Sequence, residues 1–439
     1  MKNIAVIGTG YVGLVSGAGI SDYGHNVVCT DIDISKIKRL QNGEITIYEP
    51  GLEELVNRNV QSNRLSFSSE VNKCIQRADV IFIAVGTPEG DNGSSDLSAV
   101  FDVARAIGNN LNGYKIICTK STVPIGTGAK ITEIIKETSN ELNEFGYVSN
   151  PEFLREGSAV KDFLWPDRVI IGASCARAFD TMKNVYRPLF INETPVIETT
   201  IETAELIKYA SNAFLSVKIS YINEIANICD EIGADVHVVS KAMGIDGRIS
   251  SKFLHPGPGF GGSCFPKDSK ALISMAEEMG ANLKVVKSAV EANQLQKERM
   301  VKKLFNLFDG NVKNKTIAIL GLAFKAQTDD VRESAAIDII DALQSNGAII
   351  KAFDPAANDN MKKLYNDLDT YVSWEEAVKD VDGVVIMTEW NEFRGMDLSK
   401  LKRLVKSPNI LDCRNILKID DLEKLGFKYD NVGRKKRSK

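Results

Sequence analysis

KNIAVIGTGYVG, residues 2–13, combines a short apolar run with glycines spaced as G-x-G-x-x-G. Residues 2–8 are rich in β-branched side chains, which favour a buried strand, and residues 10–23 suit a helix of small residues. A second apolar strand is expected at residues 26–31 and ends on Asp31. A strand, a glycine turn, a helix and a second strand that ends on an acid together predict a unit that binds a dinucleotide.

Each glycine of this motif has its own expected task. Gly8 permits the tight turn, Gly10 lets the backbone approach a pyrophosphate, and Gly13 allows close packing of helix on strand. The N-terminus of the helix offers free N–H groups and a partial positive charge to the phosphates. Asp31 is expected to bind the ribose hydroxyls and to repel a 2′-phosphate, which favours NAD over NADP. Lys36 can reach the same ribose. The alternative to a dinucleotide-binding site is a glycine turn that binds no ligand.

Further apolar strands are expected at residues 78–85 and 114–119. Continuous apolar strands that alternate with helices indicate a parallel sheet covered on both faces. The turn-rich segment 86–96 follows the first of these strands, and Ser95 or Asp96 is the expected cap of the next helix.

The middle of the chain is helical. Residues 203–232 form a long run without proline and with helical periodicity, and further helices are expected at residues 266–280 and 284–308. A helical middle after a completed sheet suggests a spacer or a dimer interface.

The last third of the chain repeats the opening. KTIAILG at 315–321 echoes KNIAVIG, a helix is expected at 334–346, a strand ends at Asp354, and another buried strand covers 383–388. We therefore expect an α/β fold with two Rossmann-like, doubly wound parallel-sheet domains joined by a central segment of long helices. The expected domain boundaries are 1–198, 199–300 and 301–439.

Composition excludes several classes of protein. The 439 residues include 54 basic and 58 acidic side chains, so no overall basic field is present to hold nucleic acid. No apolar run approaches the ~20 residues of a membrane span, and the chain enters a strand at once, which argues against a signal peptide. Seven dispersed cysteines without CxxC spacing indicate a reducing cytoplasm and no zinc site. The basic run 433–439 is expected to be a solvated end.

Cys264 differs from the other six cysteines in its setting. It lies in FGGSCFPKD, residues 260–268, between two glycines and a helix start marked by Pro266. A helix N-terminus and the nearby Lys267 both lower the pKa of a thiol and favour the nucleophilic thiolate. The alternative, which we assign to the other six, is an inert buried cysteine.

Polar residues also recur four positions apart, a spacing that places two side chains on one face of a helix. The pairs are Glu152/Glu156, Lys208/Asn212 and Cys264/Asp268. A solvated helix face explains a Lys and an Asn equally well, and periodicity alone leaves the choice open.

Six motifs together give the chain a family resemblance. They are GTGYVG (8–13), KSTVPIGT (120–127), NPEFLREG (150–157), AELIKYASNAFLSVKISYINE (204–224), GFGGSCFPKD (259–268) and ILGLAFKAQTDDVRES (319–334). With these motifs the chain closely resembles the UDP-glucose/GDP-mannose dehydrogenases over nearly its whole length. The resemblance implies an N-terminal NAD domain, a central helix used for dimerisation, and a C-terminal Rossmann-like domain that holds the UDP.

The resemblance also implies roles for individual residues. Cys264 matches the family's nucleophile. Its polar catalytic neighbours match Lys208, Asn212 and Asp268, and the residues that orient the water match Thr122 and Glu152. The residues expected near NAD, from the glycine motif and the resemblance together, are Gly8, Gly10, Tyr11, Val12, Gly13, Asp31, Lys36, Thr87, Thr122, Glu156, Lys267 and Arg332. Those expected to hold the sugar nucleotide are Glu152, Phe153, Leu154, Arg155, Glu156, Lys208, Asn212, Phe253, Leu254, His255, Pro256, Gly257, Gly261, Lys325 and Arg414, with Arg248 reaching the site of a neighbouring subunit in a homodimer.

The implied reaction is the oxidation of a primary alcohol of a nucleotide sugar to a carboxylate, which removes two hydrides and uses two NAD. An aldehyde lacks the hydroxyl from which a second hydride can leave, and a thiolate that adds to it supplies one. FLREG, FLWPDRVIIG (163–172) and FLHPGPGFGG (253–262) resemble the UDP-glucose branch of the family more closely, with GDP-mannose and UDP-N-acetylmannosamine as alternative substrates.

Two other classes of function compete with this interpretation. A two-electron dehydrogenase of β-hydroxy acids with Lys208 as base needs neither Cys264 nor the second α/β domain. An NAD-binding sensor without catalysis is expected to lack the set of Cys264, Lys208 and Asp268, all of which are present.

Overall fold

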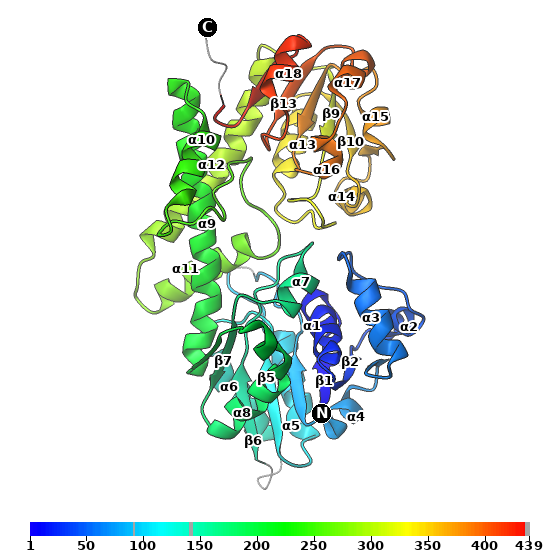
Figure 1. Ribbon diagram of the computed structural model, residues 1–439, viewed down its shortest axis with the longest axis vertical. Coiled ribbons are helices and arrows are strands. Elements are labelled where there is room, and N and C mark those ends of the chain that lie inside the picture. The colour runs from blue at the N-terminus through cyan, green and yellow to red at the C-terminus, as the bar shows by residue number, and fades with distance from the viewer. Residues whose placement is uncertain (91–92, 140–143, 435–439) are drawn as a thin grey trace. The chain divides into compact units, whose positions relative to one another are not determined.

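The computed structural model describes residues 1–90, 93–139 and 144–434 (Figure 1). Two compact units divide the chain. The first contains residues 1–211 and 274–279, and the second contains residues 212–273 and the chain from residue 280 onward. Of the basic run at 433–439, residues 435–439 lie outside the described part. Among the described helices, none is both long enough and apolar enough to cross a membrane.

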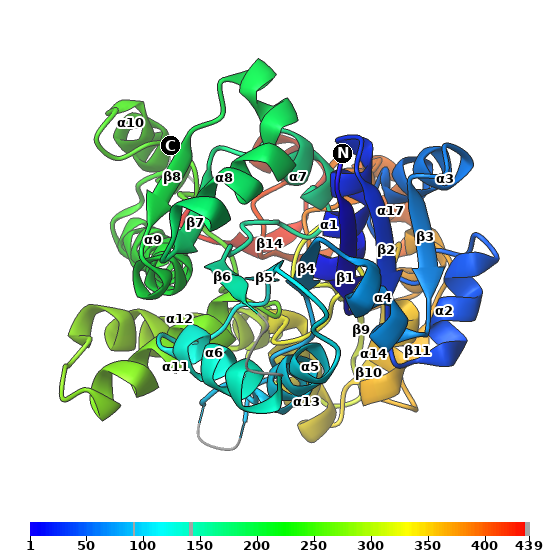
Figure 2. The ribbon, with the colours of Figure 1, turned by 90° about the horizontal axis from the view of Figure 1, so that it is seen from below.

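The first unit is built on an eight-stranded sheet. Its strands are β1 (Asn3–Ile7), β2 (Asn26–Thr30), β3 (Leu65–Ser68), β4 (Val80–Ile83), β5 (Lys115–Thr119), β6 (Phe145–Ser149), β7 (Val169–Ala173) and β8 (Val196–Thr199). They lie in the order β3-β2-β1-β4-β5-β6-β7-β8, which Figure 2 shows from one end. All neighbours pair in parallel except β6 and β7, which are antiparallel.

Helices cover both faces of this sheet (Figure 2). One face carries α1 (Tyr11–Asp22), α2 (Ile34–Gln41), α3 (Leu52–Gln61), α7 (Ala159–Leu164) and α8 (Ala176–Val185). The other carries α4 (Val71–Arg77), α5 (Ser98–Asn109) and α6 (Thr127–Thr138). A short 3₁₀ helix, η1 (Arg187–Asn192), precedes β8. The core is therefore two apolar layers, one on each side of strands that are buried on both faces.

The second unit contains a six-stranded, wholly parallel sheet in the order β11-β10-β9-β12-β13-β14. Its strands are β9 (Thr316–Leu320), β10 (Ile349–Phe353), β11 (Asp369–Thr370), β12 (Gly383–Ile386), β13 (Asn409–Asp412) and β14 (Lys428–Asn431). Its surrounding helices are α13 (Ala335–Ser345), α14 (Asn358–Leu364), α15 (Trp374–Ala377), α16 (Asn391–Arg394), α17 (Leu398–Leu404) and α18 (Ile419–Lys424).

Four further helices connect the two sheets along the chain. They are α9 (Ile201–Ile232), α10 (Val236–Ile245), α11 (Phe265–Glu278) and α12 (Lys284–Leu307). The division between the units falls inside α9 and inside α11. The absence of glycine and proline from residues 201–232 explains why α9 continues for 32 residues.

The predicted α/β fold with two parallel-sheet domains and long helices is confirmed. Four details differ from expectation. The N-cap of α5 is Leu97 rather than Ser95 or Asp96. β7 runs antiparallel to β6 at the edge of the sheet. Helix α10 was not expected, because its β-branched residues and glycine obscure the helical pattern. The Asp235 carboxylate caps this helix by accepting from the His237 N–H. Residues 150–157 precede α7 without being helical, so the four-residue spacing of Glu152 and Glu156 does not place them on one helix face.

The glycine turn after β1 is as tight as its sequence requires. Gly8 has a φ of +101°, and a Cβ placed there meets the Ala84 carbonyl oxygen at 2.6 Å. A Cβ on Gly13 meets the Gly8 carbonyl oxygen at 1.9 Å, whereas one on Gly10 has no atom within 4 Å. Gly8 and Gly13 are therefore needed for packing, and Gly10 leaves open space at the start of α1.

We predict that Gly13→Ala destabilises the protein by about 1–3 kcal/mol, because its methyl group forces α1 away from the Gly8 turn. Gly10→Ala is the matched control and is expected to unfold at the wild-type temperature. Thermal unfolding followed by circular dichroism measures both. Equal melting temperatures for Gly13→Ala and the wild type contradict the close-packing role of Gly13.

Candidate active site

The carboxyl ends of β1 and β2 bring Thr9 and Asp31 together. The N–H and the hydroxyl of Thr9 both donate to Asp31 Oδ2 at 2.8 Å, and Lys36 Nζ lies 3.7 Å from the same oxygen. Burial by itself raises the pKa of Asp31, but the hydrogen bonds from Thr9 and Asp33 and the charge of Lys36 bring that pKa below its ordinary value. Asp31 is thus held in place as an anion at the position expected for a ribose ligand.

The start of α1 fits the phosphates of NAD. Gly10 is the N-cap of this helix with extended backbone, and the first helical bond runs from Leu14 N–H to the Gly10 carbonyl. In the described part of the chain no side chain caps this end. The N–H groups of residues 11–13 therefore face the open space that Gly10 leaves.

Two threonines expected near NAD lie on neighbouring loops. Thr87 follows β4 and Thr122 follows β5, and the Thr87 hydroxyl donates to the Thr122 carbonyl oxygen at 2.9 Å. Neighbouring parallel strands end at the same sheet edge, so these loops meet without any sequence signal that pairs them.

Glu152 and Lys208 form a buried ion pair in the first unit. Lys208 Nζ lies 2.9 Å from Glu152 Oε1 and 2.7 Å from the Glu152 carbonyl oxygen. Their side chains are only 6% and 4% exposed. The apolar setting of Lys208 on α9 left a solvated face open as an interpretation, and the structure excludes it for Lys208.

The segment after Glu152 is fixed by its own side chains. The Leu154 N–H donates to the Glu152 carboxylate, and the Arg168 guanidinium lies 3.8 Å from the centre of the Phe153 ring. Arg155 forms an ion pair with Asp162 at 2.6 Å. The Arg155 side chain is thereby paired with a carboxylate of α7.

In the second unit, Cys264 immediately precedes α11, as predicted. The Asp268 N–H donates to the Cys264 carbonyl oxygen at 2.8 Å, which closes the first helical turn. Ser263 Oγ lies 3.6 Å from Cys264 Sγ. The side chain of Cys264 is partly exposed, whereas five of the other six cysteines are buried. A partly exposed thiol beside a helix N-terminus is the setting of a nucleophilic cysteine.

Asp268 anchors a short polar chain in the same unit. Asn212 Nδ2 donates to Asp268 Oδ2 at 2.7 Å, and Lys267 Nζ donates to Asp268 Oδ1 at 2.6 Å. Asp268 is 1% exposed. Asn212 is thus also buried and paired, and its amide is oriented by a carboxylate that the sequence did not connect to it.

Glycines 261 and 262 allow the cysteine loop to lie against the start of α13. A Cβ on Gly261 meets the Glu333 carbonyl oxygen at 2.2 Å, and one on Gly262 meets the Phe324 ring at 2.7 Å. The Gly262 N–H donates to the Arg332 carbonyl oxygen at 2.8 Å. The Arg332 side chain itself is exposed and paired with Asp330.

Arg414 is partly buried among three loops of the second sheet. It donates to the Met387 carbonyl at 2.7 Å and the Phe324 carbonyl at 2.6 Å, and a Cβ on Gly257 lies 3.3 Å from its guanidinium. Lys325 lies with its ammonium 5.4 Å from the Phe324 ring. The structure therefore brings together four expected substrate-binding positions, which are Gly257, Gly261, Lys325 and Arg414.

Three polar residues that were not expected from the sequence hold the loop before Cys264. Asn223 Oδ1 accepts from the Gly257 N–H, Gln296 donates to the Gly257 carbonyl, and Asn293 bonds both backbone groups of Phe260. All three are buried on α9 or α12. The sequence signal that could have identified them is an amide side chain on an otherwise apolar helix face.

The remaining expected residues of this loop differ in exposure. Leu254 and Pro256 are buried, His255 is exposed, and Phe253 has a φ of +64° with its ring against Phe265. Arg248 has a side chain that is 90% exposed and pairs with Asp246.

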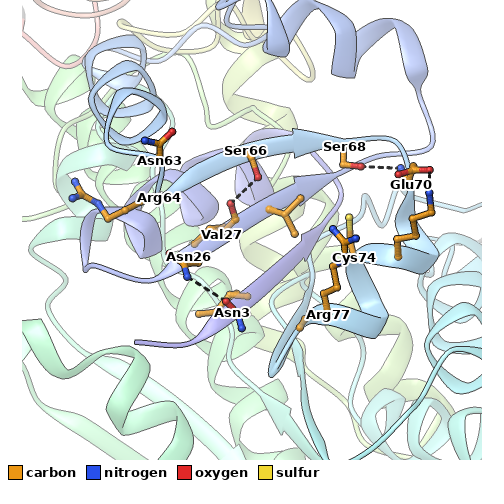
Figure 3. A pocket seen from close by; sticks show the side chains of 14 residues that line it. Asn3, Asn26, Val27, Asn63, Arg64, Ser66, Ser68, Glu70, Cys74 and Arg77 are labelled. Atoms are coloured by element: carbon orange, nitrogen blue, oxygen red, sulfur yellow. Dashed lines mark hydrogen bonds and ion pairs between the residues drawn. The ribbon is translucent and has the colours of Figure 1, made fainter.

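A hollow of about 560 Å³ lies elsewhere, on the α4 face of the first sheet (Figure 3). Asn3, Asn26, Ser66 and Arg77 are among the residues that line it. None of the expected cofactor, substrate or catalytic residues does.

Comparison with known proteins assigns each section of the chain to one family. Residues 2–190 match the NAD binding domain of the UDP-glucose/GDP-mannose dehydrogenases, residues 202–295 the central domain, and residues 318–419 the UDP binding domain. The chain is 49% identical to a UDP-glucose 6-dehydrogenase of Rhizobium meliloti, with 98% of this chain and 99% of the relative covered. It is 47% identical to UDP-glucose 6-dehydrogenase TuaD of Bacillus subtilis, with 99% and 94% covered.

A solved structure agrees with the sequence matches. The UDP-glucose dehydrogenase of the archaeon Pyrobaculum islandicum superposes with a TM-score of 0.92 and 36% identity, covering 99% of this chain and 98% of that one. The fold, the glycine turn, the cysteine loop and these full-length matches together show that the chain belongs to the UDP-glucose/GDP-mannose dehydrogenase family.

Proposed function

We propose that this protein oxidises the C6 hydroxymethyl group of UDP-glucose to the carboxylate of UDP-glucuronate, with NAD as the oxidant. The observation that carries the proposal is Cys264, a partly exposed thiol at the start of α11 beside the buried Asp268. A two-electron dehydrogenase has no use for this thiol. GDP-mannose and UDP-N-acetylmannosamine remain the alternative substrates.

The chemistry needs a covalent step at Cys264. Removal of the first hydride from the alcohol leaves an aldehyde, and addition of the thiolate converts it to a thiohemiacetal whose hydroxyl allows a second hydride to leave. The resulting thioester is hydrolysed by water to the acid and the free thiol. NAD accepts both hydrides, one molecule for each oxidation.

The chain's other polar groups have complementary roles in this proposal. The ammonium of Lys208 and the amide of Asn212 stabilise the developing oxyanion. Glu152 and Thr122 orient water, and Asp268 or Glu152 relays protons through it. The Glu152–Lys208 pair and the Asn212–Asp268 bond hold these groups in fixed orientations before the substrate binds.

We assign NAD to residues 1–198, the active-site helices to 199–300 and the UDP group to 301–439. Asp31 and the start of α1 support the first assignment. Arg414 and Lys325 support the third, because guanidinium and ammonium groups recognise phosphates. A cytoplasmic location fits a free thiol nucleophile, because a reducing compartment keeps thiols reduced.

We also propose a homodimer formed along α9. Phe214, Tyr221 and Ile228 are spaced by seven residues, so they share one face of the helix, and their side chains are 63%, 47% and 54% exposed. An apolar stripe of this kind is typical of a protein–protein interface. In the dimer, the exposed Arg248 would reach the neighbouring subunit's site.

The first test is the ratio of NADH to sugar. We predict two NADH for each UDP-glucose when a limiting amount is oxidised to completion, because both oxidations occur before release. Absorbance of NADH at the end point gives the ratio. A ratio of one contradicts the four-electron reaction, and NADH release from GDP-mannose or UDP-N-acetylmannosamine but not from UDP-glucose contradicts the assigned substrate.

The second test removes the thiol. Cys264→Ala is expected to bind NAD and UDP-glucose but to lose steady-state formation of UDP-glucuronate, with at most one hydride transferred per sugar. Cys175→Ala, which changes an exposed cysteine, is the control and keeps wild-type activity. A folded Cys264→Ala variant that forms UDP-glucuronate at the wild-type rate rules out the covalent route.

The third test concerns the dimer. Light scattering is expected to give twice the mass of one chain for the wild type. Phe214→Asp is expected to shift the protein to single chains, because it buries a charge in the apolar stripe. Val372→Asp, at another exposed apolar side chain, is the control and remains dimeric. A dimeric Phe214→Asp variant places the interface elsewhere.

A further inference from the structure

Glu49 is a buried carboxylate for which the proposed mechanism has no role. It lies in the loop between α2 and α3 of the first unit, and it is 8% exposed. In the described residues no Lys, Arg or His forms an ion pair with it. A buried carboxylate without a cation is costly unless several donors surround it, so the partners of Glu49 must be strong.

Those partners come from two other segments of the unit. Glu49 Oε2 accepts from the Gly157 N–H at 2.6 Å and from the Tyr11 hydroxyl, and Oε1 accepts from the Ala159 N–H at 2.7 Å. The Gly157 N–H also lies 3.2 Å from the Tyr11 hydroxyl oxygen. Three donors and one carboxylate therefore form a single closed cluster.

Each segment in the cluster belongs to a different part of the proposed site. Tyr11 is the first residue of α1, at the glycine turn that fits the phosphates of NAD. Gly157 directly follows residues 152–156, which are assigned to the sugar nucleotide. Gly157 has a φ of +77°, so the chain turns at the residue whose N–H donates to Glu49.

The charges around the cluster favour one arrangement. Burial raises the pKa of Tyr11, and so do its hydrogen bond to Glu49 and the charges of Glu49 and Glu156. The phenol therefore stays protonated and donates to Glu49. Burial also raises the pKa of Glu49, while the bonds from Tyr11, Gly157 and Ala159 oppose that rise. Movement of residues 157–159 would remove the Ala159 N–H from Oε1, and movement of Tyr11 would remove one of the two donors to Oε2.

We propose that Glu49 is a positioning residue that couples the binding of NAD to the binding of the sugar nucleotide, by holding Tyr11 and Gly157 in one cluster. The inference rests on the proposed function. When one ligand orders its own segment, Glu49 fixes the other segment in its binding position, so the second ligand binds more tightly. Such coupling is reciprocal.

The alternative is that Glu49 only caps the start of α7 and stabilises the fold. A cap affects the melting temperature, but it does not change how one ligand affects the affinity for the other. The decisive quantity is therefore the ratio of the dissociation constants of UDP-glucose without and with saturating NADH. NADH is used because it cannot accept a hydride, so no turnover occurs during the titration.

Five proteins are compared by calorimetric titration: wild type, Glu49→Gln, Tyr11→Phe, the double variant Glu49→Gln/Tyr11→Phe, and Glu54→Gln. Glutamine turns an amide donor toward one of the three donors around Glu49, and phenylalanine removes the hydroxyl. Glu54, exposed on α3, is the matched control. We expect a wild-type ratio of roughly 5–150, the usual range for coupled sites. This ratio should fall to about one in Glu49→Gln and in Tyr11→Phe, and it should stay unchanged in Glu54→Gln. The double variant should have the same ratio as the two single variants, because both changes break one cluster.

The outcomes separate the two proposals. A wild-type enzyme that releases no NADH from UDP-glucose overturns the proposed function and this inference with it. If turnover is present, a wild-type ratio of one overturns only the coupling by Glu49. A Glu49→Gln variant that melts earlier but keeps the wild-type ratio also overturns it, because that result leaves Glu49 as a structural cap.

Discussion

Parallel pairing of the strands is the constraint on which the candidate site residues of each unit depend. Because parallel strands run in the same direction, the carboxyl ends of neighbouring strands lie at one edge of the sheet. In the first unit this edge receives the glycine turn, Asp31, Thr87 and Thr122 from four different strands. In the second unit the same rule brings the loops after β9, β12 and β13 around Arg414. Chemistry-bearing residues far apart in sequence therefore meet without any direct sequence signal.

The two sheets use the acid at the end of their second strand in opposite ways. Asp31 is half-buried, bonded to Thr9 and Asp33, and still partly open beside Lys36. Asp354 is 2% exposed and accepts from the Leu322, Ala323, Ala356 and Ala357 N–H groups and the Trp390 indole. With its acceptors occupied by its own domain, Asp354 cannot serve a ribose. This contrast supports placing NAD in the first domain, although both openings look alike in sequence.

Buried charges are the second feature that organises the site. Lys208, Glu152 and Asp268 are each less than 10% exposed, and each has a charged or amide partner at hydrogen-bond distance. Removing one member of such a pair leaves the other buried and unpaired, which is more costly than the pair itself. This cost holds the proposed catalytic groups in fixed orientations, and Glu49 is held in the same way by backbone and phenol donors in place of a cation.

The sequence by itself determined the fold class, most of the helices and strands, the glycine turn, Asp31 and the place of Cys264 before a helix. Local rules suffice there, because strand composition, glycine spacing and helix starts act over a few residues. Only the tertiary structure decided the pairing of Lys208 with Glu152, of Asn212 with Asp268, and the loop contacts of Asn223, Asn293 and Gln296. Periodicity shows that a polar residue lies on a helix face, but not which side chain, tens of residues away, is packed against it. The antiparallel direction of β7 and the burial of Asp354 were also decided only by the tertiary structure. Strand direction and burial depend on packing partners that a single stretch of sequence does not contain.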